Sequence, residues 1–328
     1  MYVHWPLEEE RQFRLLELHP GNPGDAIKTT LVTRHVRDKP SYEAVSYCWG
    51  PAPHRDAIIL VDGYDHKVGK SLYNALNSFR RPQSVRVLWV DALCINQEDV
   101  EEKMHQVRMI GEIYTNAASV LVYLGQPTEQ TETDMHNLQS FLEPYTQRED
   151  APWFHIPIPE LERSISRILT RVWFERMWTV QEAVLARHIV LQCGPYRIQW
   201  TTDLRTLRSL VFRVKSAIVS PLYNLHKRHA EELDWTPLLY MLEYQMRQAA
   251  RREHVVLQRN LLDVAFDFRH RHCMDPRDRY YAILAIIENE RGGSFGFHAD
   301  YTMSAEEVYE RFRAAVQQIS EIEDVPLA

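Results

Sequence analysis

The sequence predicts an α/β fold: a mostly parallel sheet flanked by helices, with an α-helical C-terminal extension. Short apolar segments alternate with amphipathic segments of helical period between residues 13 and 124, and such alternation is typical of crossover connections around a parallel sheet. The segments 85–90 and 120–124 are almost wholly apolar, as expected for strands buried on both faces. From Thr201 onward the pattern is mainly helical.

The first elements are predicted to be strands. Apolar segments at 13–18, 43–47 and 57–61 have the length and composition of strands. The pair Asp62-Gly63 tolerates the positive φ angles of a tight hairpin turn, so a return strand through His66 to Val68 should follow.

Two helices should follow these strands. Ser71 is predicted to cap the first helix, in which four apolar residues share one face: Leu72, Ala75, Leu76 and Phe79. Asp99, with Glu102 three residues later, predicts a capping-box-like start for the second, which runs to about Tyr114.

The next part of the chain changes in character. Residues 126–159 are polar and interrupted by prolines, which indicates an insertion or a long loop. Helices are predicted around 160–170 and 175–186, and a short strand pair around Gly194-Pro195.

Composition and charge limit the classes of function. The 328 residues are 45% hydrophobic and 25% charged, with a formal net charge of −7, so an ordinary globular chain is expected and broad attraction to nucleic acid or anionic lipid is not. The four cysteines form no C-x-x-C pair, the N-terminal region carries Glu8 to Arg11 instead of an apolar stretch, and no apolar run is long enough to span a membrane. We expect a soluble cytoplasmic protein that does not bind DNA and has no membrane span.

Several cofactor and metal motifs are missing from the sequence. It contains no G-x-G-x-x-G, no phosphate-binding G-x-x-x-x-G-K and no H-E-x-x-H, so no resident cofactor is predicted. His226-x-x-His229 and His270-x-His272-Cys273 lack complementary ligand pairs, so no metal is predicted. Cys48 or Cys94 would need a nearby base to act as a nucleophile, and a role as a small buried apolar residue is favoured.

Four stretches resemble, in order, the motifs of the fungal heterokaryon-incompatibility (HET) domain. They are Tyr42-Glu-Ala-Val-Ser-Tyr-Cys-Trp-Gly50, Leu88-Trp-Val-Asp-Ala-Leu-Cys-Ile-Asn-Gln97, Gln106 to Gly125, and Trp173-Phe-Glu-Arg-Met-Trp-Thr-Val-Gln-Glu182. The resemblance is dense over 42–182 and sparse afterwards, where Asp275-Pro-Arg-Asp278 continues it. We therefore expect a HET-like domain over 1–200, with its insertion at about 126–159, and a mainly helical extension over 201–328 packed on it.

The resemblance implies a role in fungal non-self recognition and programmed cell death. HET domains have been likened to TIR domains, some of which hydrolyse NAD with a helix glutamate in a W-x-x-x-E-like motif, and Trp178 and Glu182 stand at that spacing. The likeness implies a TIR-like or flavodoxin-like core, NAD as a substrate rather than a cofactor, self-association, and an incompatibility or NLR-type signalling partner.

Glu182 is the predicted catalytic residue. Trp178, Gln181 and Glu182 lie three and four residues apart, so they should share one face of a helix. A carboxylate held near the ribose can stabilise the oxocarbenium-like charge that develops when the nicotinamide–ribose bond breaks. The alternative is that Trp178 anchors the core and Glu182 is a surface charge. No basic residue lies one helical turn away from Glu182, but Arg171, Arg176 or Arg187 could still reach it through a tertiary contact.

Asp91 follows a predicted buried strand, and ligands in open α/β sheets bind at the carboxyl ends of strands. The predicted substrate-binding residues, which should converge with Glu182, are Tyr47, Trp49, Asp91, Asn96, Trp178 and Gln181. Asp91 and Asn96 have the alternative roles of capping a helix or holding a loop, and for Trp49 packing in the core is favoured.

Three hypotheses of function follow. The first is a death effector that hydrolyses NAD or a related nucleotide at the nicotinamide–ribose bond. The second is a non-catalytic signalling module that acts through self-assembly or partner binding. The third is a pocket that binds a nucleotide only as a regulatory ligand.

Overall fold

A computed structural model of the protein describes residues 3–50, 57–145, 147–219, 233–255, 261–291, 293 and 296–322. By its internal contacts the chain forms two compact units. The first comprises Met1–Pro127 and Ala186–Pro195, and the second Thr128–Leu185 and Tyr196–Ala328. These units follow contacts rather than sequence patterns, and the expected domain boundary at residue 200 stays a prediction.

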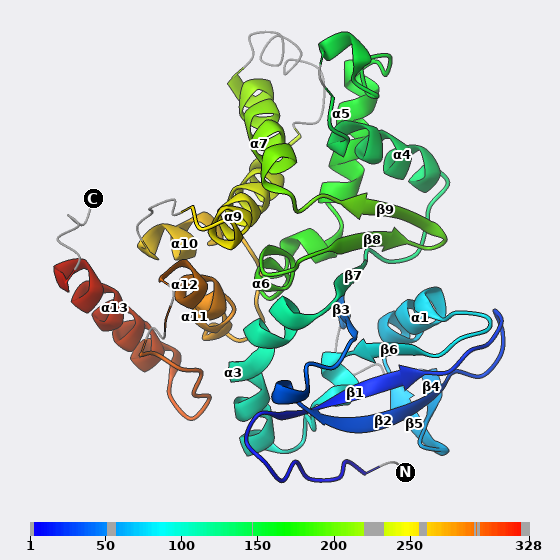
Figure 1. Ribbon diagram of the computed structural model, residues 1–328, viewed down its shortest axis with the longest axis vertical. Coiled ribbons are helices and arrows are strands. Elements are labelled where there is room, and N and C mark those ends of the chain that lie inside the picture. The colour runs from blue at the N-terminus through cyan, green and yellow to red at the C-terminus, as the bar shows by residue number, and fades with distance from the viewer. Residues whose placement is uncertain are drawn as a thin grey trace. The chain divides into compact units, whose positions relative to one another are not determined.

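The first unit is built on a mixed sheet with the strand order β5-β4-β2-β1-β6-β3-β7-β8 (Figure 1). Its strands are β1 (Gln12–Leu18), β2 (Lys28–His35), β3 (Glu43–Tyr47), β4 (Ala57–Val61), β5 (Tyr64–Val68), β6 (Arg86–Trp89), β7 (Ser119–Tyr123) and β8 (Ile189–Cys193). Strands β6, β3, β7 and β8 run parallel to one another, as do β2 and β4. The pairs β1–β2, β1–β6 and β4–β5 are antiparallel. The predicted α/β fold with a mostly parallel sheet is confirmed.

The strand β2 has no counterpart among the predicted elements. It pairs with β1 along seven positions, from Gln12–His35 to Leu18–Thr29, yet most of its side chains are half-buried or exposed. A strand of this kind lacks both the apolar run and the strict alternation by which strands are recognised. Its partner strand, rather than its own sequence, therefore identifies it.

The predicted hairpin turn is confirmed between β4 and β5. Asp62 and Gly63 have φ angles of 50° and 82°, and Val61 pairs with Tyr64 across the turn. Two consecutive positive φ angles are characteristic of a type I′ turn, whose twist matches that of the flanking strands.

Helices α1 (Lys70–Phe79), α2 (Asp91–Cys94) and α3 (Val100–Asn116) complete the first unit, together with the 3-10 helix η1 (Val36–Asp38). Helix α1 buries the four predicted apolar residues. The predicted cap at Ser71 is wrong, because Gly69 is the N-cap residue and helix α1 has no side-chain cap.

The prediction for the N-terminus of helix α3 is confirmed for Asp99 but not for Glu102. Asp99 accepts hydrogen bonds from the backbone N–H groups of Glu101 and Glu102 at 3.0 Å each. Glu102 does not complete a capping box, because its carboxylate pairs with the buried guanidinium of Arg14 instead. A buried cation needs a charged partner, and this need outweighs the gain from a second cap.

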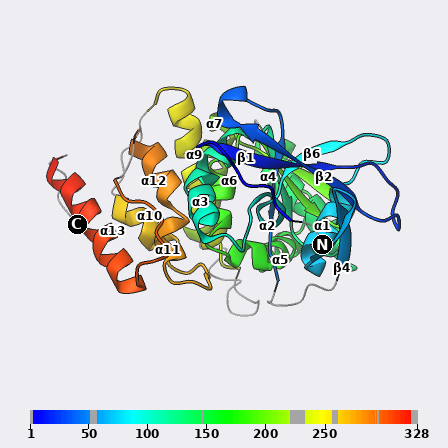
Figure 2. The same cartoon turned by 90° about the horizontal axis from the view of Figure 1, so that it is seen from below.

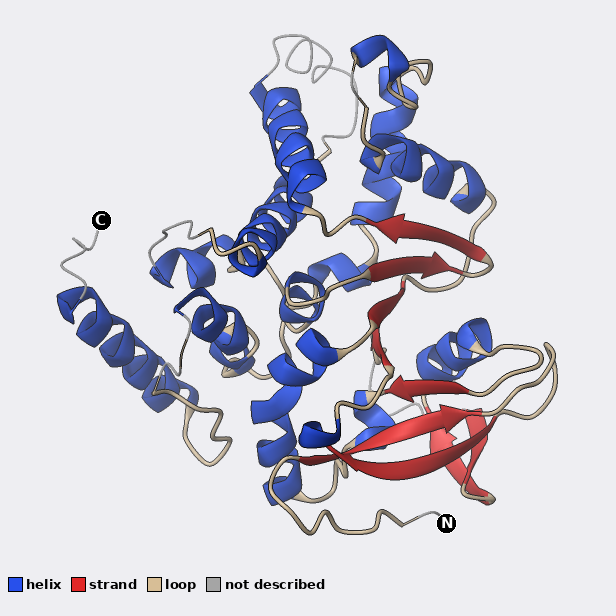
Figure 3. Ribbon diagram, in the orientation of Figure 1, coloured by secondary structure: helices blue, strands red, loops and turns tan. Residues whose placement is uncertain are grey.

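The second unit is mainly helical, as predicted for the chain beyond Thr201 (Figure 3). Its elements are α4 (Thr131–Leu142), η2 (Arg148–Asp150), α5 (Ile158–Leu169), η3 (Val172–Glu175), α6 (Thr179–Val184), β9 (Tyr196–Trp200), α7 (Leu204–Val219), α9 (Thr236–Arg252), α10 (Leu261–Asp267), α11 (Asp278–Tyr281), α12 (Leu284–Arg291) and α13 (Ala305–Ile322). The last helix, α13, packs beside α11, as Figures 1 and 2 both show.

Two predicted elements of this unit need correction. The segment 126–159 is not simply a long loop, because α4 occupies its centre. The helix expected over 175–186 is shorter, because Arg176 is extended (φ −79°, ψ 140°) and forms a β-bridge with His272. A residue held in extended pairing cannot continue a helix, so α6 begins only at Thr179.

Over the residues that the structure describes, no helix is both long and apolar enough to cross a membrane.

Candidate functional site

Strands β3 and β6 deliver Trp49 and Asp91 to the same edge of the sheet of the first unit. The two strands are parallel neighbours, Trp49 follows the end of β3, and Asp91 opens helix α2 just after β6. The indole Nε1–H of Trp49 donates to Asp91 Oδ2 at 2.8 Å. The edge predicted to hold ligand-binding residues therefore contains one of the predicted pairs in direct contact.

Trp49 is not a core residue, so the packing role favoured for it is wrong. Its side chain is 40% exposed, and its orientation is fixed by the hydrogen bond to Asp91. The other carboxylate oxygen of Asp91 accepts from the backbone N–H of Ala92 at 2.7 Å. The result is a partly exposed aromatic plane anchored to a carboxylate that is itself fixed at a helix start.

Tyr47 and Asn96 are held in other ways. Tyr47 ends β3 and is buried, with 4% of its surface exposed. The side-chain oxygen of Asn96 accepts from the backbone N–H of Glu98 at 3.3 Å. The backbone N–H of Asn96 donates to the carboxylate of Glu102 at 2.7 Å. Asn96 thus holds the loop before α3, which was the alternative to substrate binding, and the binding role of both residues stays a prediction.

Glu182 lies on the short helix α6 of the second unit, and its environment excludes the surface-charge alternative. The residue is only 8% exposed, and Gln181 beside it is 2% exposed. Trp178 is half-buried at the N-cap of α6, whereas Trp173, 2% exposed, packs edge-on against Phe174 at 4.9 Å. The core anchor of this motif is therefore Trp173 and not Trp178.

Hydrogen bonds from helix α9 hold α6 in place. The side-chain amide of Gln245 donates to the carbonyl of Ala183 at 3.1 Å, and Arg252 donates to the carbonyl of Leu185 at 3.0 Å. At the other end, the hydroxyl of Thr179 donates to the carbonyls of Trp173 and Arg176. A six-residue helix is unstable by itself, so these contacts explain why the backbone around Glu182 is helical.

The predicted residues are divided between the two compact units. Tyr47, Trp49, Asp91 and Asn96 belong to the first unit, and Trp178, Gln181 and Glu182 to the second. The convergence of the two groups on one substrate stays a prediction.

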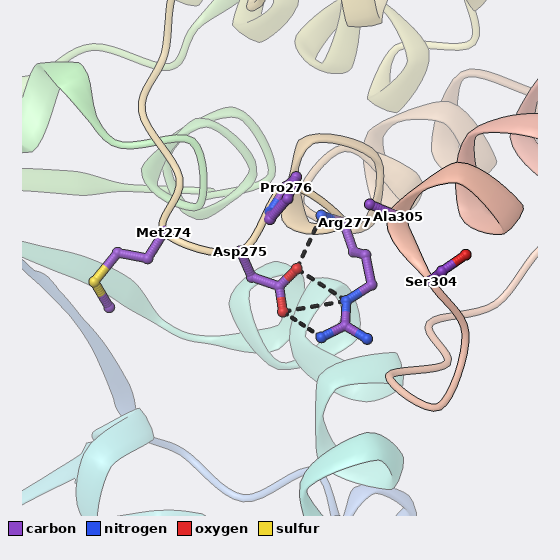
Figure 4. A pocket seen from close by; sticks show the side chains of 6 residues that line it. All are labelled: Met274, Asp275, Pro276, Arg277, Ser304 and Ala305. Carbon is purple, nitrogen blue, oxygen red and sulfur yellow. Dashed lines mark hydrogen bonds and ion pairs between the residues drawn. The ribbon is translucent and has the colours of Figure 1, made fainter.

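A cavity of about 480 Å³ lies elsewhere in the second unit (Figure 4). Its lining is Met274, Asp275, Pro276, Arg277, Ser304 and Ala305, and it includes none of the predicted site residues. The sequence marked Asp275-Pro-Arg-Asp278 only as part of the family resemblance, and no signal of chemistry pointed to a cavity there.

Contacts within the protein engage the charged pair in this cavity wall. Arg277 binds the carboxylate of Asp275 through Nε and Nη2, and its Nη1 donates to the carbonyls of Tyr301 and Met303 at 2.7 and 2.8 Å. Figure 4 shows the two side chains facing each other across the wall. Arg277 therefore ties the loop before α11 to the segment before α13.

The cysteines are free thiols. Cys94 is fully buried, and burial raises the pKa of its thiol to about 12. Because the thiolate is the reactive form, this burial disfavours a nucleophilic role for Cys94 near neutral pH. Its buried, apolar role agrees with the favoured alternative.

Metal ligation has no structural support among the described residues, where no three His, Cys, Asp or Glu side chains gather around a common point. The side chain of His270 is exposed, and partial desolvation, together with the neighbouring charge of Arg271, lowers its pKa below the ordinary value. His226 and His229 lie outside the described residues.

The first unit thus has an α/β sheet with a tryptophan–carboxylate pair at one edge, and the chain continues as helices. Residues 42–182 match the model of the family described as heterokaryon incompatibility protein (HET). Over this range the match supports the resemblance to HET domains that the sequence motifs indicated.

One curated relative, heterokaryon incompatibility protein 6, OR allele, from Neurospora crassa, is 29% identical over 223 residues. The match covers 55% of this chain and 33% of the relative, so the chain spans about a third of the length of the protein that it matches. No solved structure matches the chain.

Proposed function

We propose that this chain is an effector of fungal non-self recognition and programmed cell death, and that it hydrolyses NAD or a related nucleotide at the nicotinamide–ribose bond. The role in incompatibility is supported by the family match over residues 42–182 and by the name of the Neurospora relative. The enzymatic part rests on the chain's own residues.

One observation carries the enzymatic proposal: Glu182 is only 8% exposed and lies four residues after a half-buried tryptophan. A buried carboxylate is held in a fixed position by the partners that compensate its burial. A carboxylate removed from water interacts strongly with a positive charge that develops beside it. Glu182 is therefore suited to stabilise an oxocarbenium-like ribose.

The reaction needs only water as a co-reactant. The bond between ribose C1′ and the nicotinamide nitrogen breaks, and its electron pair leaves with nicotinamide. Water then adds to C1′ and releases a proton, which gives ADP-ribose. In this scheme Glu182 stabilises the positive charge on the ribose and orients its hydroxyl groups.

Trp49 and Asp91 are suited to bind the aromatic base of such a nucleotide. The exposed indole plane offers a stacking surface for a base, and aromatic stacking contributes about 1–3 kcal/mol per base. The hydrogen bond of 2.8 Å to Asp91 fixes the plane before the ligand arrives, which lowers the entropy cost of binding.

The test measures nicotinamide release from NAD by the 328-residue chain at high protein concentration, so that assembly is not limiting. We expect release by the wild type and a loss of roughly 100-fold or more in Glu182→Gln, the size typical for removal of a group that stabilises transition-state charge. Glu175→Gln is the matched control, because Glu175 is exposed and lies in the preceding 3-10 helix. Circular dichroism checks that both variants fold.

Three outcomes separate the hypotheses. Equal activity in Glu182→Gln and the wild type would remove Glu182 from catalysis. Binding of NAD without release would favour a regulatory nucleotide pocket. Neither binding nor release under assembling conditions would favour a non-catalytic module that acts through self-assembly or partner binding.

A further inference from the structure

Arg213 of helix α7 is a buried cation within an aromatic cluster of the second unit. It is 9% exposed, and its Cζ atom lies 5.3, 4.4 and 5.9 Å from the ring centroids of Phe141, Tyr145 and Trp153. Its Nη1 donates to the backbone carbonyl of Phe141, in the last turn of α4. Cation–π contacts and one hydrogen bond therefore hold the guanidinium in position.

One edge of this guanidinium makes no hydrogen bond within the described part of the chain. Nε and Nη2 of Arg213 are buried and have no hydrogen-bond partner there. These two nitrogens present parallel N–H groups, and their spacing matches the two oxygens of a carboxylate. Buried donors are almost always satisfied in native proteins, so an acceptor is expected at this edge.

Among the described residues, the same edge holds a carboxylate at Arg313, which pairs with exposed Glu310, and at three further arginines. The three further pairs are Arg86 with Glu43, Arg167 with Asp134, and Arg277 with Asp275, each formed through Nε and Nη2. In the pair of Arg86 with Glu43 the two N–O distances are 2.5 and 2.9 Å. Arg213 offers the same pair of donors, and no carboxylate of the described residues is bound to it.

Besides the carbonyl of Phe141 and the phenol of Tyr145, the surroundings of Arg213 supply further donors. The indole N–H groups of Trp153 and Trp235 are also buried without a hydrogen-bond partner, and Trp235 packs against Phe141 with ring centroids 5.5 Å apart. Burial lowers the pKa of Arg213, and the opposing effect comes from the phenol of Tyr145 rather than from an acidic side chain. The cluster therefore favours an incoming anion.

We propose that the Nε/Nη2 edge of Arg213 is a binding site for a carboxylate, supplied by a small organic acid or by an acidic side chain of a peptide partner. The surrounding rings would exclude water and contact the apolar stem that carries the carboxylate. The site shares no residue with the proposed NAD chemistry, so either proposal can fail without the other.

The test titrates the 328-residue chain with glutarate, poly-L-glutamate and inorganic phosphate, and follows tryptophan fluorescence and the melting temperature. We expect saturable binding of a carboxylate probe and a rise in melting temperature. Arg213→Lys should weaken that binding roughly tenfold or more, because an ammonium group keeps the charge but lacks the planar pair of donors. The matched control is Arg208→Lys, an exposed position on the same helix, which should bind as the wild type does.

The two sources of the carboxylate are distinguished by the probes. Binding of glutarate supports a small acid, and binding of poly-L-glutamate alone supports an acidic segment of a partner. The proposal is overturned by tighter binding of phosphate than of either carboxylate, by no saturable carboxylate binding up to about 10 mM, a concentration beyond the weakest specific affinities, or by unchanged affinity in Arg213→Lys.

A second measurement needs no variant. In a crystal of the wild-type chain grown with the probe that binds, the carboxylate oxygens should lie within hydrogen-bond distance of Nε and Nη2 of Arg213. A probe bound elsewhere, with this edge occupied only by water, would also overturn the proposal.

Discussion

The buried pair of Arg14 and Glu102 should be a main source of stability in the first unit. Their side chains are 2% and 9% exposed, and they are joined by hydrogen bonds of 2.6 and 2.9 Å. Glu102 also accepts from the backbone N–H of Asn96 at 2.7 Å. This carboxylate therefore ties strand β1, helix α3 and the loop before that helix to one another.

We expect Glu102→Gln to lower the free energy of unfolding by about 3 kcal/mol. Breaking a buried ion pair by removing one partner typically costs roughly 3–5 kcal/mol, because a buried charge is left uncompensated. The lower end applies here, since a glutamine oxygen in the place of Oε1 still accepts two of the three hydrogen bonds. Glu101→Gln is the matched control: Glu101 is exposed in the same helical turn, and its substitution should cost less than about 0.5 kcal/mol.

The assay is urea denaturation followed by circular dichroism, with the double variant Arg14→Met/Glu102→Leu as a further sample. An apolar pair of similar volume should recover most of the loss, because neither charge is then left unpaired. A loss below about 1 kcal/mol in Glu102→Gln would refute the reasoning, since it is smaller than the desolvation cost of one buried charge. An equal loss in Glu101→Gln would refute it as well.

The pH dependence gives an independent check of the same pair. Burial by itself raises the pKa of Glu102, but the hydrogen bonds from Arg14 and Asn96 outweigh it, and the net pKa is lowered. A lowered folded-state pKa contributes stability that is present above the unfolded value, near 4.3, and is lost as the pH falls through the folded value. This acid-side loss should be smaller in Glu102→Gln than in the wild type.

Three further predictions concern the fold. Gly63→Ala should lower the free energy of unfolding by about 1 kcal/mol, because the φ of 82° is unfavourable for alanine. An added Cβ would meet nothing within 4 Å, so no steric clash adds to this cost. A larger loss of stability in thermal unfolding would contradict a purely conformational cost. Gly194→Ala should cost clearly more, about 2–4 kcal/mol, because its Cβ would lie 2.7 Å from the ring of Pro127 in addition to a φ of 54°; equal losses in the two variants would contradict the clash. Cys94 should not react with a thiol reagent at pH 8 in the folded protein and should react after unfolding, since burial raises its pKa to about 12; mass spectrometry of the labelled peptides identifies it, and labelling of native Cys94 at the rate of the unfolded chain would show the burial to be wrong.

Patterns local in the sequence determined much of the secondary structure. The type I′ turn at Asp62-Gly63 follows from the positive φ angles that these residues tolerate. The buried face of α1 follows from a period of 3.6 residues, and the meeting of Trp49 with Asp91 follows from the rule that parallel strands end at a common edge. Each of these features depends on residues that are neighbours in the sequence or on a general property of parallel sheets.

Contacts between distant segments decided the rest. Strand β2 is stabilised by its hydrogen bonds to β1, and helix α6 is short because Arg176 pairs with His272. The carboxylate of Glu102 binds Arg14, 88 residues away, instead of capping the helix that contains it. The free energy of such contacts depends on burial and on which groups meet, and neither is written in a local pattern. The same holds for the Nε/Nη2 edge of Arg213, which only the packing of α4, α7 and the start of α9 brings among aromatic rings.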